Sequence, residues 1–227
     1  MRKSLVIVAV AVVLIGLSVR AIWADSAEEW NSKGKEAYAA NNYQEAAKYY
    51  SKALEINPKM QKTLFNRGLT YYRMKKYGEA RADLSAATAI NPKDHEAIFY
   101  IGLTYFGEGK YGEAFSQFEK AAEIERLPLY LLNAAAARFN SGLHHATIQH
   151  CKMCLRLNPD DEIREKATDL MAKAEEQLKE DRDRLASAKR SSVRMEAPPK
   201  KNVQLKWIQT ADTSPKSSGG GGGGGGG

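Results

Sequence analysis

The sequence predicts an all-α fold, a solenoid of stacked helix–turn–helix units, and three observations carry this prediction. The pentapeptide KYGEA occurs at Lys76–Ala80 and again at Lys110–Ala114, and a looser copy, NYQEA, occupies Asn42–Ala46. The three copies start 34 residues apart. Glycines keep the same spacing at positions 34, 68 and 102, and Asn-Pro pairs follow at 57–58 and 91–92. A fixed period of this length is typical of repeats that pack one against the next.

Each copy of the repeat contains two amphipathic helices. In the third copy Ile98, Ile101 and Tyr105 lie three and four residues apart, on one face of a first helix. Gly109 interrupts that pattern. A second apolar stripe follows, formed by Tyr111, Ala114, Phe118, Ala121 and Ala122. The residue before a proline avoids the α conformation, so the Asn-Pro pairs are expected to end the second helices. Small residues at the crossing let the helices approach closely, and larger neighbours fill the remaining space.

These residues resemble the tetratricopeptide repeat (TPR) family, which combines a large apolar residue, a glycine, an aromatic residue, small residues and a final proline. The matching positions are Trp30, Gly34, Ala46, Tyr50, Ala53 and Pro58, then Leu64, Gly68, Tyr71, Ala80, Leu84, Ala87 and Pro92, then Ile98, Gly102, Tyr105, Ala114, Phe118 and Ala121. The third copy departs from the pattern at Arg126, which stands where the final proline belongs. The resemblance implies a right-handed superhelix whose inner groove is lined by the first helices and holds partner peptides.

The period predicts repeats at 27–60, 61–94 and 95–128, followed by a degenerate fourth repeat at 129–160 that is one residue short. Two registers remain open for the fourth repeat. Anchoring on Asn158-Pro159 gives Cys151 and Cys154 the positions of helix-packing residues. Anchoring on Phe139 as the aromatic position instead moves the deletion to the turn near Gly142.

A capping helix is expected at 161–189, because a solenoid must cover its last apolar face. Asp160 and Asp161 supply capping oxygens and favourable charge at its start. Its apolar stripe consists of Ile163, Ala167, Leu170, Met171, Ala174 and Leu178.

Residues 1–24 form a different kind of segment. Two basic residues precede an uncharged apolar run from Leu5 to Val19, and small residues follow it. This order is typical of a signal peptide cleaved after Ala24 or Ala21. The alternative is an uncleaved membrane tether through residues 4–19, although this run is short for a membrane span. Both interpretations predict that the repeats are exported, most simply to a bacterial periplasm.

Residues 190–227 form a low-complexity tail that ends in nine glycines. One apolar island interrupts it at 202–210, where Val203, Leu205 and Trp207 alternate with polar residues. An extended segment would present all three side chains on one side. We therefore expect this island to dock on the capping helix, in its own chain or a neighbouring one. An unstructured tail is the alternative.

The net charge of +7 does not describe a basic surface on the repeats. Three positive charges belong to the N-terminal segment and a net +4 belongs to the tail, whereas residues 160–189 carry a net −3. Nucleic acid is therefore not an expected partner.

No motif in the chain favours an enzyme. Cys151 and Cys154 form a C-x-x-C pair, but they lie inside a predicted helix rather than at a helix start after a strand, where redox motifs occur. We interpret them as packing thiols, with a periplasmic redox role as an alternative. A metal site would recruit His144, His145 or His150, and we interpret these histidines as surface residues. The sequence predicts no metal and no cofactor.

The first helices carry an apolar and aromatic row at the groove positions. The candidate binding residues are Tyr38, Phe65, Asn66, Leu69, Tyr72, Phe99, Leu103 and Phe106. The carboxylate clamp that the resemblance would imply is mostly missing. Asn66 remains, but Asn31, Lys35, Glu96 and Tyr100 stand at its other positions. The sequence therefore predicts an exported adaptor that binds an apolar protein segment. The alternatives are a membrane-tethered assembly subunit that self-associates through the capping helix or tail, which leaves a homo-oligomer open, and the thiol protein.

Overall fold

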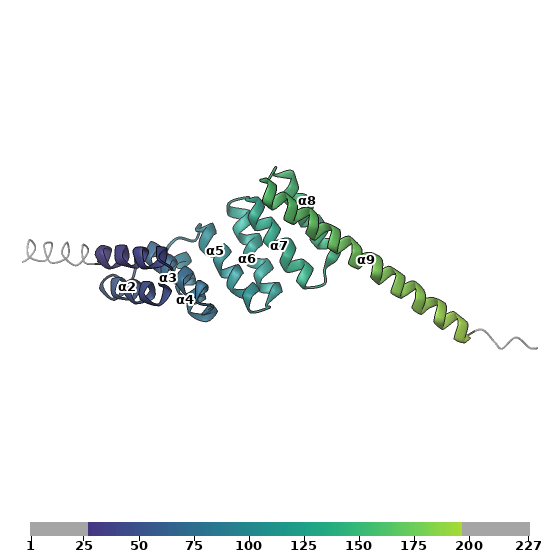
Figure 1. Ribbon diagram of the computed structural model, residues 1–227, viewed down its shortest axis with the longest axis horizontal. Coiled ribbons are helices and arrows are strands. Elements are labelled where there is room, and N and C mark those ends of the chain that lie inside the picture. Colours follow the sequence, from purple (N-terminus) through teal and green to yellow (C-terminus); the bar gives the residue numbers. More distant parts are fainter. Residues whose placement is uncertain (1–26, 197–227) are drawn as a thin grey trace, which may run out of the picture. The chain divides into compact units, whose positions relative to one another are not determined.

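The computed structural model describes residues 27–196, with side chains described as far as residue 191. A helix at 27–39 is followed by α2 (Tyr43–Ile56), α3 (Gln61–Arg73), α4 (Tyr77–Ile90), α5 (His95–Gly107), α6 (Tyr111–Ile124), α7 (Pro128–Asn140), α8 (His144–Arg156) and α9 (Asp161–Glu196). Helices that are consecutive in the chain pack against one another from α2 to α8 (Figure 1). The all-α solenoid of helix pairs is therefore confirmed.

The N-terminal segment 1–24 and the tail island 202–210 lie outside the described residues. The signal peptide, the membrane tether and the docking of Val203, Leu205 and Trp207 therefore stay predictions. Within residues 27–196, no helix combines the length and the apolar character that crossing a membrane requires.

The turn between the two helices of each pair contains one residue in the left-handed backbone conformation. These residues are Asn41 (φ 61°), Lys75 (φ 59°), Gly109 (φ 75°) and Gly142 (φ 74°). The first three are 34 residues apart and the last is 33 from its predecessor. Asparagine and glycine tolerate this conformation well, whereas Lys75 adopts it at a steric cost. The turn therefore marks the same position in all four repeats.

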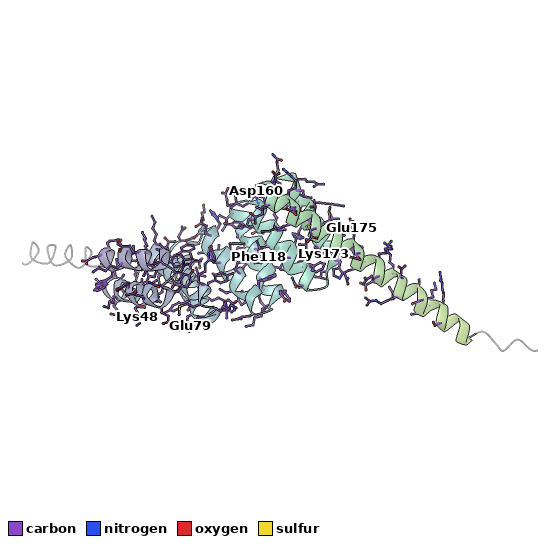
Figure 2. All side chains as sticks on the ribbon, viewed as in Figure 1. Lys48, Glu79, Phe118, Asp160, Lys173 and Glu175 are labelled. Carbon is purple, nitrogen blue, oxygen red and sulfur yellow. The ribbon has the colours of Figure 1, made fainter. Side chains whose placement is uncertain are left out.

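A glycine on the first helix packs against a large side chain on the second helix of the same repeat. A Cβ atom placed on Gly34, Gly68 or Gly102 would come within 2.5, 2.8 and 2.6 Å of Tyr50, Leu84 and Phe118, respectively. All three large side chains are almost completely buried. Phe118 is labelled among the helices in Figure 2. The glycine thus leaves room that the partner side chain fills, as the sequence predicts.

The structure decides between the two registers of the fourth repeat. The left-handed turn at Gly142 and the starts of α7 and α8 all lie 33 residues after their counterparts in the third repeat. Ala135 therefore corresponds to Gly102, and Cys151 corresponds to Phe118. Both fourth-repeat residues are fully buried. The missing residue lies at the junction between α6 and α7, so the Asn158-Pro159 register is correct and the register anchored on Phe139 is not.

Helix α9 begins with a side-chain cap, because the Ile163 backbone N–H donates to Asp160 Oδ1 at 2.8 Å. Ala167 and Ala174 are fully buried. Ala167 belongs to one apolar cluster with Leu131 and Leu132 of α7 and Cys154 of α8. The described chain divides into two compact units between residues 184 and 185, inside α9. All contacts discussed below lie within the first unit.

Candidate functional site

The candidate site is the inner face, which we define as the exposed side of the first helices of repeats one to three. At its centre lies Tyr100 of α5. Its ring centroid is 5.8 Å from the rings of Phe65 and Tyr72 on α3, and both contacts are edge-on. We call Phe65, Tyr72 and Tyr100 the aromatic platform. All three are half-buried, and burial raises the pKa of Tyr72 and of Tyr100. These rings offer a stiff apolar surface edged with hydroxyl groups.

A further side-chain contact joins the second repeat to the first. Arg73 Nε donates a hydrogen bond to the Tyr38 hydroxyl at 3.2 Å. This bond raises the pKa of Arg73 above its ordinary value. The guanidinium therefore remains charged at the end of α3, beside the platform.

An open cleft of about 480 Å³ lies at the other end of α3. We call it the lysine cleft. Its walls come from the helix at 27–39, from α3, and from the loop and first turn of α5. The lining residues are Lys35, Gln61, Lys62, Phe65, Asn66, Asn91, Lys93, Asp94, His95 and Glu96. Phe65 belongs to both the cleft and the platform, so the two form one continuous surface.

Polar bonds between successive first helices hold this surface together. Thr63 Oγ1 donates to the buried Asn31 Oδ1 at 3.0 Å, and Gln61 Nε2 donates to Asp94 Oδ2. His95 Nδ1 lies 2.8 Å from the Tyr130 hydroxyl. Each junction between repeats therefore carries at least one such bond, and the first junction also has the Arg73–Tyr38 bond. The Asn31 side chain is buried, and its oxygen is already bonded to Thr63.

Seven of the eight predicted groove residues are partly exposed, and they make three kinds of contact. Phe65, Asn66, Leu69 and Tyr72 are half-buried on α3, and the first two line the lysine cleft. Tyr38, Tyr72 and Phe106 each pack against a ring of their own repeat, Tyr43, Tyr77 and Tyr111, respectively. Leu103 and Phe106 pack on the apolar cluster around Phe118. These residues therefore contribute to packing within the repeats while staying partly exposed on the first helices.

The prediction that Phe99 lines the groove is wrong. Only 6% of it is exposed, and its ring stacks on Tyr130 of α7 at 4.6 Å and contacts Phe118 at 5.4 Å. Phe99 belongs to the core between the third and fourth repeats and is not a groove residue. The next residue, Tyr100, takes the exposed position that the sequence assigned to Phe99. Arg73 was also missed, although an arginine beside an aromatic row could have indicated it.

The two cysteines are buried free thiols. Neither is measurably exposed, and Cys154 Sγ lies 3.3 Å from the Pro128 carbonyl oxygen. Burial raises the pKa of Cys151 to about 12 and also raises that of Cys154. A thiol nucleophile needs the opposite shift and solvent access. This geometry argues against the thiol protein as the function.

The histidines near the fourth repeat make separate contacts. His150 packs its ring edge-on against Phe115 and lies 3.3 Å from Glu119, whereas His144 packs against Phe139. Among the residues that the structure describes, no three His, Cys, Asp or Glu side chains gather closely enough to hold a metal ion.

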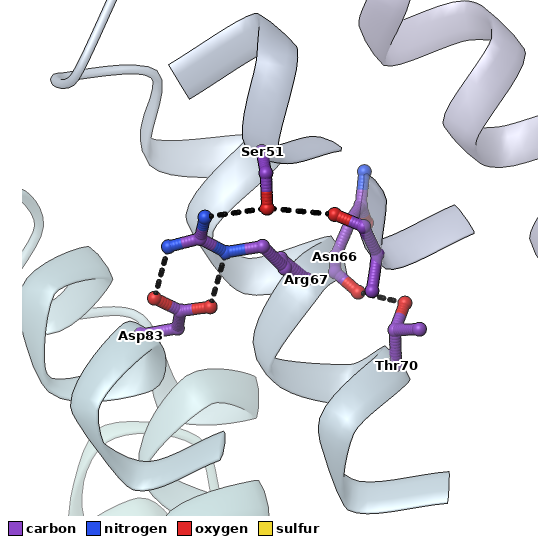
Figure 3. A network of polar contacts seen from close by, with 6 residues as sticks. Ser51, Asn66, Arg67, Thr70 and Asp83 are labelled. Carbon is purple, nitrogen blue, oxygen red and sulfur yellow. Dashed lines mark hydrogen bonds and ion pairs between the residues drawn. The ribbon is translucent and has the colours of Figure 1, made fainter. Parts of the chain in front are cut away.

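The interior of the second repeat contains an ion pair. Arg67 of α3 donates through Nε and a terminal nitrogen to the two carboxylate oxygens of Asp83 on α4, both at 2.7 Å (Figure 3). Its other terminal nitrogen donates to Ser51 Oγ of α2 at 3.0 Å. The pair is largely buried, with 21% of the arginine and 9% of the aspartate side chain exposed. It fastens the second repeat to the first from within.

Comparison with known proteins identifies the repeats. Three tetratricopeptide repeat families match residues 27–60, 61–94 and 95–126. No curated protein matches the sequence.

Among solved structures, MamA from Desulfovibrio magneticus RS-1 is similar, with a TM-score of 0.57, 21% identity, and coverage of 58% of this chain and 75% of that one. Another MamA crystal structure gives a TM-score of 0.59 at 16% identity, covering 68% and 89%. The Arabidopsis OM64 TPR domain gives 0.50 at 21% identity, covering 51% and 97%. At these identities the likeness shows the fold alone.

Proposed function

The chain belongs to the tetratricopeptide repeat family, and on that premise we propose that it is an exported adaptor that binds a protein segment on its inner face. The family is one of protein-interaction modules, so a protein partner is the coarse expectation. The binding surface is the finer part of the proposal. It consists of the aromatic platform, the lysine cleft and Leu69 between them.

The observation that carries this proposal is the exposed part of the aromatic platform. Phe65 and Tyr72 both contact Tyr100, yet each of the three rings stays only half-buried. Rigid aromatic side chains at the centre of a surface are the residues that most often dominate binding energy. Their mutual contacts fix the rings before a partner arrives, which reduces the entropy lost on binding.

A pair of tyrosine variants tests the binding surface. Tyr72→Ala removes a platform ring, and Tyr49→Ala removes a half-buried tyrosine that stacks on Trp30 of the first repeat instead. If the platform is a hot spot, Tyr72→Ala should weaken partner binding by about 2–4 kcal/mol, while Tyr49→Ala should leave it within about 0.5 kcal/mol. Titration calorimetry with the partner purified by the wild-type chain measures both. Equal effects of the two variants would contradict the inner-face site.

Export is proposed from the N-terminal sequence alone. The basic pair and the apolar run from Leu5 to Val19 support a signal peptide or a tether. Intact-mass measurement of the mature chain separates these two, because cleavage removes the segment and a tether retains it. Fractionation of the source cells completes the test, and recovery of the full-length chain in the cytoplasm would contradict export.

We propose a non-catalytic role, since the described site offers aromatic rings, amides and ammonium groups but no activated nucleophile. The membrane-tethered assembly subunit remains the second candidate, favoured by the apolar run. Carbonate extraction of membranes distinguishes it, because a tethered chain stays with the lipid and a free one is released.

A further inference from the structure

The lysine cleft and the aromatic platform together indicate the chemistry of the partner. We propose that the bound segment is acidic as well as apolar, with side-chain carboxylates seated in the lysine cleft and apolar residues on the platform. This inference rests on the proposed function and specifies the partner of the same surface.

The lining of the lysine cleft contains three lysines against two carboxylates, so positive charge is in excess. No carboxylate forms an ion pair with Lys35, Lys62 or Lys93 within the described part of the chain. All three are exposed. Asp94 keeps its negative charge, but neither of its oxygens is free to bind a lysine, because one accepts from the Ala97 backbone N–H at 3.0 Å and the other from Gln61. Glu96 is the remaining carboxylate in the lining.

The neutral groups of the cleft suit the same ligand. Asn66 and Gln61 bring amide groups to the wall, and Asn66 comes from the same helical turn as Phe65. An ammonium group and an amide N–H both donate hydrogen bonds to a carboxylate oxygen. A basic segment would instead face three lysines and would be repelled, which gives the cleft a charge preference.

A fourth cation, Arg73, lies at the far end of α3. Arg73 is hydrogen-bonded to Tyr38 through Nε, and no carboxylate lies within ion-pair distance of it in residues 27–191. Lys62 and Arg73 are eleven residues apart, which is about 17 Å along a helix. An extended chain covers that distance in about five residues. The surface therefore fits two acidic positions separated by a short apolar stretch.

The bound carboxylates belong to side chains rather than to a chain terminus. A terminal-carboxylate clamp would use the positions of Asn31, Glu96 and Tyr100, and these residues are respectively buried in another bond, negatively charged and part of the platform. Lys35 and Asn66 of the cleft do stand at clamp positions, whereas its other two cations, Lys62 and Lys93, lie elsewhere on the surface.

Three fluorescein-labelled peptides test this inference with the full chain. Two are acetylated and amidated and share a Leu-x-Tyr centre, one flanked by pairs of Glu and the other by pairs of Lys. The third is the Glu peptide with a free C-terminus. In fluorescence anisotropy at low salt, the Glu peptide should bind at least about tenfold more tightly than the Lys peptide. The difference should shrink at high salt, because exposed charges are screened.

Charge reversal supplies the matched controls. The double variant Lys62→Glu and Lys93→Glu should abolish or reverse the preference for Glu over Lys. Lys48→Glu changes an exposed lysine of α2 that does not line the cleft, and it should leave the preference unchanged. Circular dichroism checks that each variant is folded. All the substituted side chains are exposed, so stability should be preserved.

The outcomes separate this inference from the proposed function. Equal binding of the Glu and Lys peptides would overturn the charge preference and leave the inner-face site standing. A requirement for the free C-terminus would also overturn it. Binding of neither peptide would count against both the preference and the site.

Discussion

The second and third repeats have the same backbone but different interiors. Arg67 of α3 forms a bidentate ion pair with Asp83, whereas the equivalent residue of α5, Ile101, is packed in an apolar cluster. The equivalent of Asp83 is Gln117. The helix-packing side chain changes as well, from Leu84 in the second repeat to Phe118 in the third. The glycine, the alanines and the turn therefore fix the repeat, and the remaining interior accepts either an ion pair or an apolar cluster.

The junctions between repeats show the same freedom. Arg81 of α4 stacks on the ring of Tyr105 in the next repeat, with 4.6 Å between the guanidinium carbon and the ring centre. One repeat later the roles are exchanged, because Arg138 of α7 lies 3.4 Å from the ring centre of Phe115 in the preceding repeat. A cation and a ring meet at equivalent places in both junctions. The cation and the ring can thus change sides of a junction without altering how the repeats stack.

The largest effect should follow from removing the packing side chain of the third repeat. Phe118→Ala empties a fully buried position that contacts Phe99 and Gly102, and it should cost about 3–5 kcal/mol of unfolding free energy. The equivalent change in the fourth repeat, Cys151→Ala, removes only one sulfur atom and should cost about 1–2 kcal/mol. Urea unfolding of both variants measures the difference. Similar losses from the two variants would mean that the loss does not follow the size of the side chain removed, and the two positions would then not be equivalent.

The ion pair of the second repeat can be converted into the pair of the third. Arg67→Ile alone leaves the Asp83 carboxylate almost buried without its partner, and should cost about 2–4 kcal/mol after allowance for partial exposure. Adding Asp83→Gln removes the buried charge and should restore most of that loss. The double-mutant cycle in urea reports the coupling. If the second substitution restored nothing, the ion pair would not be the cause of the loss.

Alkaline pH should distinguish the fourth repeat from the third, since Phe118 cannot ionise and Cys151 can. Burial raises the pKa of Cys151 to about 12, whereas a thiol in an unfolded chain titrates near about 8.5. The unfolded state therefore loses its proton first. The contribution to stability is complete below about pH 8.5 and is lost as the pH rises towards about 12.

The pH dependence of the urea midpoint measures this effect. Cys151→Ala should reduce the fall in stability above about pH 9 but not eliminate it, because burial also raises the pKa of Tyr50 and Tyr130 to about 12. An unchanged slope in the variant would mean that Cys151 is accessible to solvent. Labelling by a thiol reagent in the folded state would lead to the same conclusion.

The smallest effect is expected at Lys33, which occupies in the first repeat the position of Arg67 in the second. Lys33 does not reach across the helix pair. It is exposed and pairs with Glu29 one turn earlier on its own helix. Lys33→Gln should therefore leave the melting temperature unchanged within error, because solvent screens such pairs. A loss comparable to that of Arg67→Ile would show that the position matters more than the contact.

The fold was predictable because the repeat determines it. Gly34, Gly68 and Gly102 recur where two helices must approach, so spacing alone indicated the helix pairs, whereas the side chains that pack on these glycines are known only from the structure. The fourth repeat was less predictable, since Phe139 and Asn158-Pro159 suggested different registers. The deciding feature is the left-handed turn at Gly142. Ala135 and Cys151 show why the pattern fades there. Ala135 is larger than the glycine of the other repeats, and Cys151 is smaller than the side chain that packs on that glycine.

The candidate site was only partly predictable. Periodicity identified the residues of each first helix that face away from the core of their own repeat. Phe65 and Tyr72 were correctly among them. It could not show which of two adjacent aromatic residues the following repeat would cover. Phe99 is buried because Tyr130 of α7 stacks on it, and Tyr100 is left on the inner face. The Tyr38–Arg73 bond joins residues 35 positions apart and has no counterpart in the repeat pattern.

The most direct test of the central claim, that the inner face binds a protein segment, is site-specific photocrosslinking in the source cells. A photoreactive phenylalanine analogue is placed at Leu69 on the inner face, or at Lys48 or Glu79 on the exposed sides of α2 and α4 (Figure 2). The account predicts one discrete crosslinked protein from Leu69 and none from Lys48 or Glu79. Crosslinks from Lys48 or Glu79 but not from Leu69 would contradict it.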